Sequence, residues 1–302
     1  MDSAQLPIID CHLHFFDARV HRYPIFQQRS VGFETLVGDY SALPRRYYPE
    51  DYFKDVKGFH VTRTVCAEFM SDSCLEEVRW LQGLSTQGGQ PSGTIALADF
   101  TSPDIERLLE EYASLGRVHA VRQHLGWHPS NPLLRFAPAP DLLSDANWRR
   151  GVASLRKHGL CCEIEIFAHQ LPGLAAVARS FPDQQFVFPL MGWPLDVTEA
   201  GYQAWKRDMT ALSACQNVAV KIFGMECIFG QGWNLRQVRP WILDVIALFG
   251  PARCMFASHM PITLLVCSFQ DLYRAYLEAV SDFGASEKRQ LFHDTAAVVY
   301  GL

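Results

Sequence analysis

The chain has 302 residues, of which 49% are hydrophobic and 20% are charged, and its formal net charge at pH 7 is -5. This composition suits one large core, so we expect a single domain over residues 1–302. The acidic balance disfavours a nucleic-acid partner, and no apolar run reaches the ~20 residues of a membrane span. The opening Met-Asp-Ser-Ala-Gln lacks a signal-peptide pattern, which predicts a cytoplasmic protein.

Eight short apolar runs alternate with helical segments along the chain. Runs of this kind are typical of parallel strands that are covered on both faces. The predicted strands are 6–14, 63–69, 93–98, 120–123, 161–167, 185–190, 218–223 and 254–258. Helices are predicted at 102–114, 146–157, 171–180, 202–214, 241–249 and 271–281. This order predicts an α/β fold, a (β/α)8 TIM barrel, rather than an open doubly wound sheet.

The first strand carries the most informative residues of the sequence. The two-residue period of a strand places Asp10, His12 and His14 on one face. Two closely spaced imidazoles at the C-terminal end of a barrel strand are candidates for catalysis or metal binding; the alternative is a pair of core histidines. A glycine-rich dinucleotide loop does not follow this strand.

The connection after the first strand, from residue 15 to about residue 61, is longer than a normal strand-to-helix loop. It contains the cluster Arg45-Arg46-Tyr47-Tyr48-Pro49. Because long loops are often functional, we expect this cluster to cap the mouth of the barrel. Arg46 and Tyr48 are therefore candidates for substrate binding.

Other polar residues follow later strands, and the C-terminal ends of barrel strands meet at one mouth. Arg122 offers a two-pronged donor to a carboxylate or lactone carbonyl, unless it forms a structural ion pair. Lys221 lies in an apolar run and needs a partner, a shifted pKa or a route to the mouth. Further candidates for substrate binding at strand ends are Glu68, His124 and His169.

His259 follows the last predicted strand, in the run Ala-Ser-His-Met-Pro. The unperturbed pKa of an imidazole lies near neutral pH, which suits the activation of a water molecule. We therefore assign His259 as the candidate general base. Arg122, His12 and His14 are the other catalytic candidates, which we expect to stabilise the developing oxyanion or to hold a substrate carboxylate. The alternative is a histidine that merely caps the strand end.

Taken together, these segments resemble the amidohydrolase-2 family of TIM-barrel hydrolases, and specifically its lactonase branch. The resemblance runs over nearly the whole chain and depends on the order and spacing of its motifs. They are Ile9-Asp-Cys-His-Leu-His14, Arg22-Tyr-Pro24, Tyr48-Pro-Glu-Asp-Tyr52, 121–129, Gly192-Trp-Pro194, 220–224, 253–261 and 295–300. The resemblance implies hydrolysis of a sugar-acid or aromatic-catabolic lactone at the mouth of the barrel.

Two positions depart from the pattern of that family. Leu190 stands where many members have a histidine, and His259 stands where they usually have Asp or Asn. In metal-using relatives these positions supply a ligand and an acidic ligand or base. His12 and His14, with His259, remain as ligands for a single divalent metal such as zinc, with Glu68 as another candidate, and some lactonases of this kind work without a metal.

The leading hypothesis is therefore a hydrolase that opens a small carboxylate- or hydroxyl-bearing lactone, with no cofactor required or with one zinc ion. A decarboxylase, another lyase or a biosynthetic enzyme on the same scaffold is the first alternative, and carbon dioxide release would favour it. A non-catalytic barrel that binds a small acid is the second. The expected partners are a small-molecule substrate and, as an option, further copies of the same chain.

Overall fold

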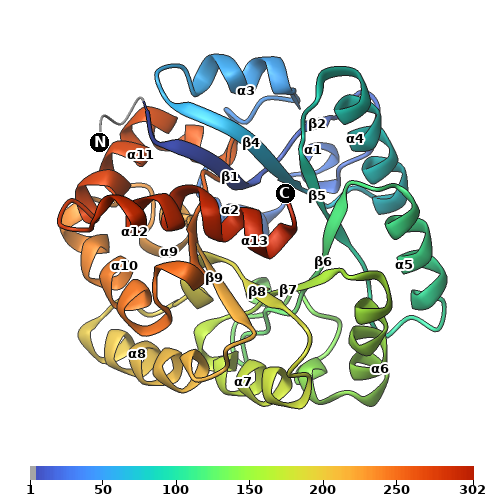
Figure 1. Cartoon of the computed structure of the whole chain (residues 1–302). Coiled ribbons are helices and arrows are strands. Elements are labelled where there is room, and N and C mark those ends of the chain that lie inside the picture. Colours follow the sequence, from blue (N-terminus) through green and yellow to red (C-terminus); the bar gives the residue numbers. More distant parts are fainter. Residues whose placement is uncertain (1–4) are drawn as a thin grey trace.

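The computed structural model describes residues 5–302. Eight parallel strands follow one another around a barrel in the order of the sequence. They are β1 (Pro7–Leu13), β4 (His60–Ala67), β5 (Gly93–Leu97), β6 (Val118–His124), β7 (Cys161–Glu165), β8 (Phe186–Phe188), β9 (Val218–Ile222) and β10 (Cys254–Phe256). The predicted TIM barrel is thereby confirmed (Figure 1).

Helices surround the barrel and cover its outer face (Figure 1). Those between or after the barrel strands are α4 (Cys74–Gly88), α5 (Ile105–Ser114), α6 (Ala146–Leu155), α7 (Leu171–Ser180), α8 (Glu199–Ser213), α9 (Met225–Phe229), α10 (Leu235–Phe249), α11 (Phe269–Ala279), α12 (Ala285–Arg289) and α13 (Thr295–Tyr300). The sequence analysis did not predict α4. It also started α10 too late, because Pro240, which removes one backbone donor, lies inside that helix.

The burial pattern of α10 shows why these segments become helices. Val238, Trp241, Ile242, Val245 and Phe249 are buried, and their spacing of three and four residues forms one apolar stripe. The side chain of Asn234 accepts a hydrogen bond from the backbone of Gln237 and caps the first turn. Among residues 5–302, no helix has the length and apolar character needed to cross a bilayer.

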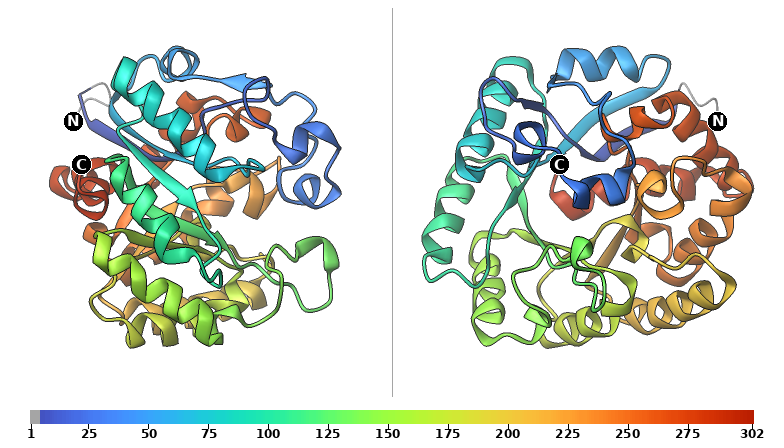
Figure 2. Two further views of the ribbon diagram at one scale, coloured as in Figure 1. Left: turned by 90° about the vertical axis from the view of Figure 1, so that its right-hand side faces the viewer. Right: turned by 180° about the vertical axis from the view of Figure 1, so that it is seen from behind.

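The long connection after β1 is folded. It contains β2 (Phe16–Asp17), α1 (Pro24–Gln27), α2 (Val31–Val37), β3 (Arg46–Tyr47) and α3 (Pro49–Asp55). β2 and β3 pair as an antiparallel ribbon, so the predicted cap cluster of residues 45–49 forms part of that ribbon. Its helices α1 and α2 lie at one end of the barrel, and the C-terminal helices α12 and α13 lie at the other (Figure 2).

Candidate active site

A cavity of about 270 Å³ lies at the C-terminal ends of the barrel strands. This volume is slightly below the ~300–1,000 Å³ of typical ligand pockets, so it suits a small molecule. Polar side chains from several strand ends form its floor, and apolar side chains form its walls. The floor residues are His12, His14, Arg122, His124, Glu165 and His259; the walls include Ile25, Phe33, Leu36, Val37, Phe69, Met70, Phe136, Leu190, Trp193, Phe223 and Ile262.

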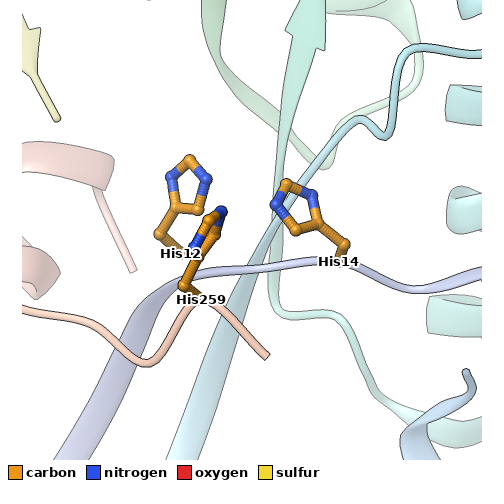
Figure 3. A group of neighbouring side chains, drawn as sticks. All are labelled: His12, His14 and His259. Atoms are coloured by element: carbon orange, nitrogen blue, oxygen red, sulfur yellow. The ribbon is translucent and has the colours of Figure 1, made fainter. Parts of the chain in front are cut away.

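Three histidines converge on this floor (Figure 3). The ring centroids of His12 and His14 lie 5.1 Å apart, and His259 lies 5.7 Å and 5.4 Å from them. Two backbone hydrogen bonds bring the first and last strands together: the amide of His259 donates to the carbonyl of His12, and the amide of His14 to that of Met260. The predicted proximity of β1 and residue 259 therefore follows from the closure of the barrel.

Each of these imidazoles has an acceptor near its Nδ1 atom. His14 Nδ1 lies 3.0 Å from the carbonyl of Ala67, and His259 Nδ1 lies 2.6 Å from Glu226 Oε1. A carbonyl or carboxylate oxygen accepts a hydrogen bond, so Nδ1 carries a proton in both rings. His12 Nδ1 lies 3.6 Å from Glu163 Oε1, a buried oxygen with no hydrogen-bond partner among the described residues.

Burial and nearby cations keep His12 and His14 neutral. Burial lowers the pKa of His12 and His14 well below the ordinary value of 6.5, and neighbouring positive charges lower it further. For His12 the largest of these charges is Lys221, and Arg122 also contributes. At pH 7 both rings are therefore uncharged and can accept a proton, a hydrogen bond or a metal.

A buried ion network lies beside the histidines. Arg122 donates from Nε to Glu68 Oε1 over 2.6 Å and from Nη2 to the Glu68 carbonyl over 2.9 Å. His124 Nδ1 lies 2.7 Å from Glu165 Oε1, and its Nε2 lies 3.3 Å from Glu68 Oε1. Two cations thus balance two carboxylates, and Arg122 Nη1 is 3.8 Å from Glu165 Oε2, outside hydrogen-bond range.

This network predicts a pH-dependent stability. Burial alone would lower the pKa of His124, but attraction to Glu165 outweighs it and raises the value to about 9. The folded state then holds an extra proton between about pH 6.5 and pH 9, so the free energy of unfolding should fall as the pH rises through this window. Urea unfolding of the wild type and of His124→Gln should show a shallower fall in the variant. Identical pH slopes would contradict this assignment of charge to His124.

A second buried ion pair lies behind the floor. Lys221 Nζ on β9 donates to Glu163 Oε2 on β7 over 2.6 Å, and neither side chain is exposed. Lys221 Nζ also lies 3.3 Å from His12 Nδ1, and the hydroxyl of Tyr300 donates to the same carboxylate. Lys221 therefore has the partner that its apolar surroundings require, and this pair supports the His12 ring from behind.

The structure thus separates the predicted site residues. His12, His14, Arg122, His124 and His259 line the cavity, whereas Glu68 lies behind Arg122 and Lys221 behind His12. The other three predicted substrate-binding residues, His169, Tyr48 and Arg46, are not among the residues that line this cavity. His169 is exposed and contacts the carbonyl of Trp127, the hydroxyl of Tyr48 donates to Asp17, and the exposed Arg46 guanidinium lies over the Tyr48 ring. Their role in substrate binding stays a prediction.

Asp10 also differs from the role that strand alternation suggested. The pairing of β1 with β4 is irregular between Asp10 and Leu13, so a strict two-residue period does not hold there. Asp10 instead accepts hydrogen bonds from the hydroxyl of Tyr52 and the amide of Ser258. Burial raises its pKa to about 6, although these hydrogen bonds oppose that shift. Asp10 therefore joins the first strand to the last one, below the histidines.

The sequence analysis missed Glu226 and Glu165. Both follow or end a barrel strand, so the polar residues at strand ends carried the signal that could have found them. It also missed the apolar wall that α2 contributes, although Phe33 and Leu36 show helical spacing within the long connection. Leu190 lines the cavity with a backbone φ of 57°, a left-handed conformation, and its hydrocarbon side chain offers no ligand atom.

The histidine cluster fits a divalent cation. The donor nitrogens of His12, His14 and His259 all lie within 4.8 Å of one another. The three histidines have the ligand chemistry of a zinc site, and the Nδ1 atoms of His14 and His259 have the oxygen acceptors that support such ligands. His12 differs, because the donor-only ammonium of Lys221 lies 3.3 Å from its Nδ1 and favours a proton on Nε2. Lys221 therefore opposes this fit, since ligation through His12 Nε2 requires the proton on Nδ1.

The fold and site together define a TIM-barrel enzyme with a histidine cluster at the C-terminal ends of its strands. Comparison with known proteins agrees. Residues 9–302 match the family model described as Amidohydrolase. The chain is 31% identical to the uncharacterized protein y4mH of Sinorhizobium fredii, over 98% of this chain and 99% of that protein. The chain belongs to the amidohydrolase family and is a hydrolase.

Two further relatives are informative. The chain is 24% identical to an L-fucono-1,5-lactonase of Burkholderia multivorans, over 97% of this chain and 96% of that enzyme. The crystal structure of an amidohydrolase from Burkholderia multivorans with bound zinc superimposes with a TM-score of 0.81 at 21% identity, over 98% of this chain and 99% of that one. The second likeness shows the shared fold.

Proposed function

We propose that the protein hydrolyses small lactones at the cluster of His12, His14 and His259. The observation that carries this proposal is the 2.6 Å contact of His259 Nδ1 with Glu226, which leaves Nε2 as the ring nitrogen available to a water in the cavity that Arg122 also lines. The relative named as a lactonase supports the same reaction class. An imidazole base and a cationic hydrogen-bond donor in one cavity are a combination that can hydrolyse an ester bond.

The reaction follows from these positions. His259 Nε2 accepts a proton from a water molecule, and the resulting hydroxide attacks the lactone carbonyl carbon. Arg122 Nη1 has no hydrogen-bond partner among the described residues and is the donor available to the oxyanion. When the ring C–O bond breaks, His259 returns its proton to the leaving alkoxide, which yields the hydroxy acid. His14 Nε2 lacks a proton, so it orients the water as an acceptor rather than stabilising the oxyanion.

A pH-indicator screen tests the proposal. The purified protein is incubated with sugar-acid lactones, muconate-type lactones and simple alkyl lactones, and acid release is compared with the uncatalysed rate. Acid release above that rate is the expected result. A silent panel would contradict the proposal and direct the search to carbon dioxide release by a lyase.

The place of a metal can be tested separately. An ion held by His12, His14 and His259 would supply a Lewis acid and lower the pKa of a bound water. It would also occupy the lone pair of His259 that we assign to proton transfer, so the two roles exclude each other. Since the contact of Lys221 with His12 Nδ1 disfavours ligation through His12 Nε2, we expect the hydrolysis rate after chelator treatment and dialysis to stay within about twofold of the untreated rate. Loss of activity that zinc restores would make the three histidines ligands instead.

A further inference from the structure

The cavity has a sharp division between its floor and its walls. Hydrogen-bonding side chains gather at the floor, near the three histidines, whereas the walls are hydrocarbon and aromatic. Phe33, Leu36 and Val37 of α2 close one side, and Trp193 and Phe136 form another, with their rings stacked 6.3 Å apart. The walls carry few polar atoms: the Ser30 hydroxyl accepts a hydrogen bond from the amide of Phe33, Cys227 contributes a thiol, and Trp193 Nε1 has no hydrogen-bond partner among the described residues.

The polar floor has little capacity left for further hydroxyl groups. Arg122 and His124 direct most of their donors to Glu68 and Glu165, as described above. What remains at the floor is Arg122 Nη1, Glu165 Oε2 and the Nε2 atoms of the histidines, and on the walls Trp193 Nε1 has no hydrogen-bond partner among the described residues. The ester bond and the water of the reaction would take up part of these groups. A substrate with several further hydroxyls would have to place most of them against hydrocarbon and aromatic wall side chains, which is unfavourable.

We infer, resting on the proposed lactone hydrolysis, that the preferred substrate carries a hydrocarbon substituent, alkyl or aryl, on its lactone ring. Contact with the walls favours the binding of apolar groups, since each methylene that is buried raises the binding constant roughly fourfold. The relative named L-fucono-1,5-lactonase has a sugar lactone in its name, so this chain diverges from that relative in substrate class. The inference also replaces the carboxylate- or hydroxyl-bearing ring that the sequence alone suggested.

A matched series of six-membered lactones tests this inference on the wild-type protein. The series is δ-valerolactone, its butyl-substituted form δ-nonalactone, the aryl-fused dihydrocoumarin, and D-glucono-1,5-lactone as the sugar. After subtraction of the uncatalysed rate, kcat/KM for the butyl or the aryl lactone should exceed that for δ-valerolactone by at least about tenfold. The sugar lactone should be the poorest substrate. A sugar lactone that equals or exceeds the hydrocarbon-substituted lactones would overturn the inference.

Two neighbouring positions on α2 supply a matched pair of variants. Leu36 lines the cavity, whereas Thr35 is exposed and its hydroxyl donates to the backbone of Val31. Leu36→Asn should lower the ratio of kcat/KM for δ-nonalactone over δ-valerolactone by about threefold or more, because one apolar wall contact becomes polar. Thr35→Asn should leave that ratio unchanged. Equal ratios in the two variants would remove α2 from the substrate wall and contradict the inference.

A binding experiment distinguishes failure of this inference from failure of the proposed function. Two lactams that resist hydrolysis, piperidin-2-one and 6-butylpiperidin-2-one, are titrated against the protein by calorimetry. If no lactone is hydrolysed, lactone hydrolysis fails as the function, but tighter binding of the butyl lactam still supports a hydrocarbon-bearing ligand. If the butyl lactam binds no tighter than the unsubstituted lactam, the inference is wrong whatever the outcome for activity.

Discussion

Replacing His259 with alanine should lower kcat/KM for lactone hydrolysis by about 10²–10⁴-fold, the range that a general acid–base residue contributes. The physical reason is that His259 Nε2 is the free basic atom that Glu226 orients toward the floor of the cavity. The side chain of His259 is 13% exposed, so its removal leaves a space that water can enter and should not disturb the core. Initial rates at saturating and limiting substrate measure the loss.

The control for this variant is a histidine far from the cavity. His60 is exposed at the first residue of β4, at the opposite end of that strand from the site, and His60→Ala should keep the wild-type rate. Far-UV circular dichroism and thermal unfolding should match among wild type and both variants. A His259→Ala variant that is folded and retains wild-type activity would remove His259 from the mechanism.

Replacing Lys221 with methionine should destabilise the protein by about 3–5 kcal/mol, because it leaves the carboxylate of Glu163 buried without its cation. Both side chains are completely buried, and each is the other's main charged partner, at a distance of 2.6 Å between Lys221 Nζ and Glu163 Oε2. Methionine keeps the length and apolar character of the lysine stem, so loss of charge is the dominant change. Urea unfolding followed by tryptophan fluorescence measures the effect.

The double variant supplies the test of cause. In Lys221→Met combined with Glu163→Gln, no uncompensated charge remains, and the amide oxygen can still accept from the hydroxyl of Tyr300. We expect the double variant to recover more than half of the stability that Lys221→Met loses. If both variants are equally unstable, the loss comes from packing around residue 221 and not from the buried charge of Glu163.

The sequence predicted the barrel because each strand and helix has a local signature. A short apolar run such as 218–223 indicates a covered strand, and regular alternation with helices restricts the fold to few topologies. Barrel topology in turn places the C-terminal ends of all strands at one mouth, which is why the sequence alone groups His12, His14, Arg122 and His259. These inferences require only the order of the residues along the chain, and they do not require any distance between atoms in the folded protein.

The chemical state of the site depends on contacts that local patterns do not contain. The acceptors of His14 and His259 are the carbonyl of Ala67 and the carboxylate of Glu226, which lie 53 and 33 residues away along the chain. Their distances depend on strand register and on closure of the barrel, and both are set by packing of the whole molecule. The same holds for α2, since only the folded connection shows that Leu36 faces the cavity and that Arg46 does not. The sequence by itself therefore determined the fold and most of the candidate reacting groups, whereas the tertiary structure decided their protonation, their partners and the apolar walls around them.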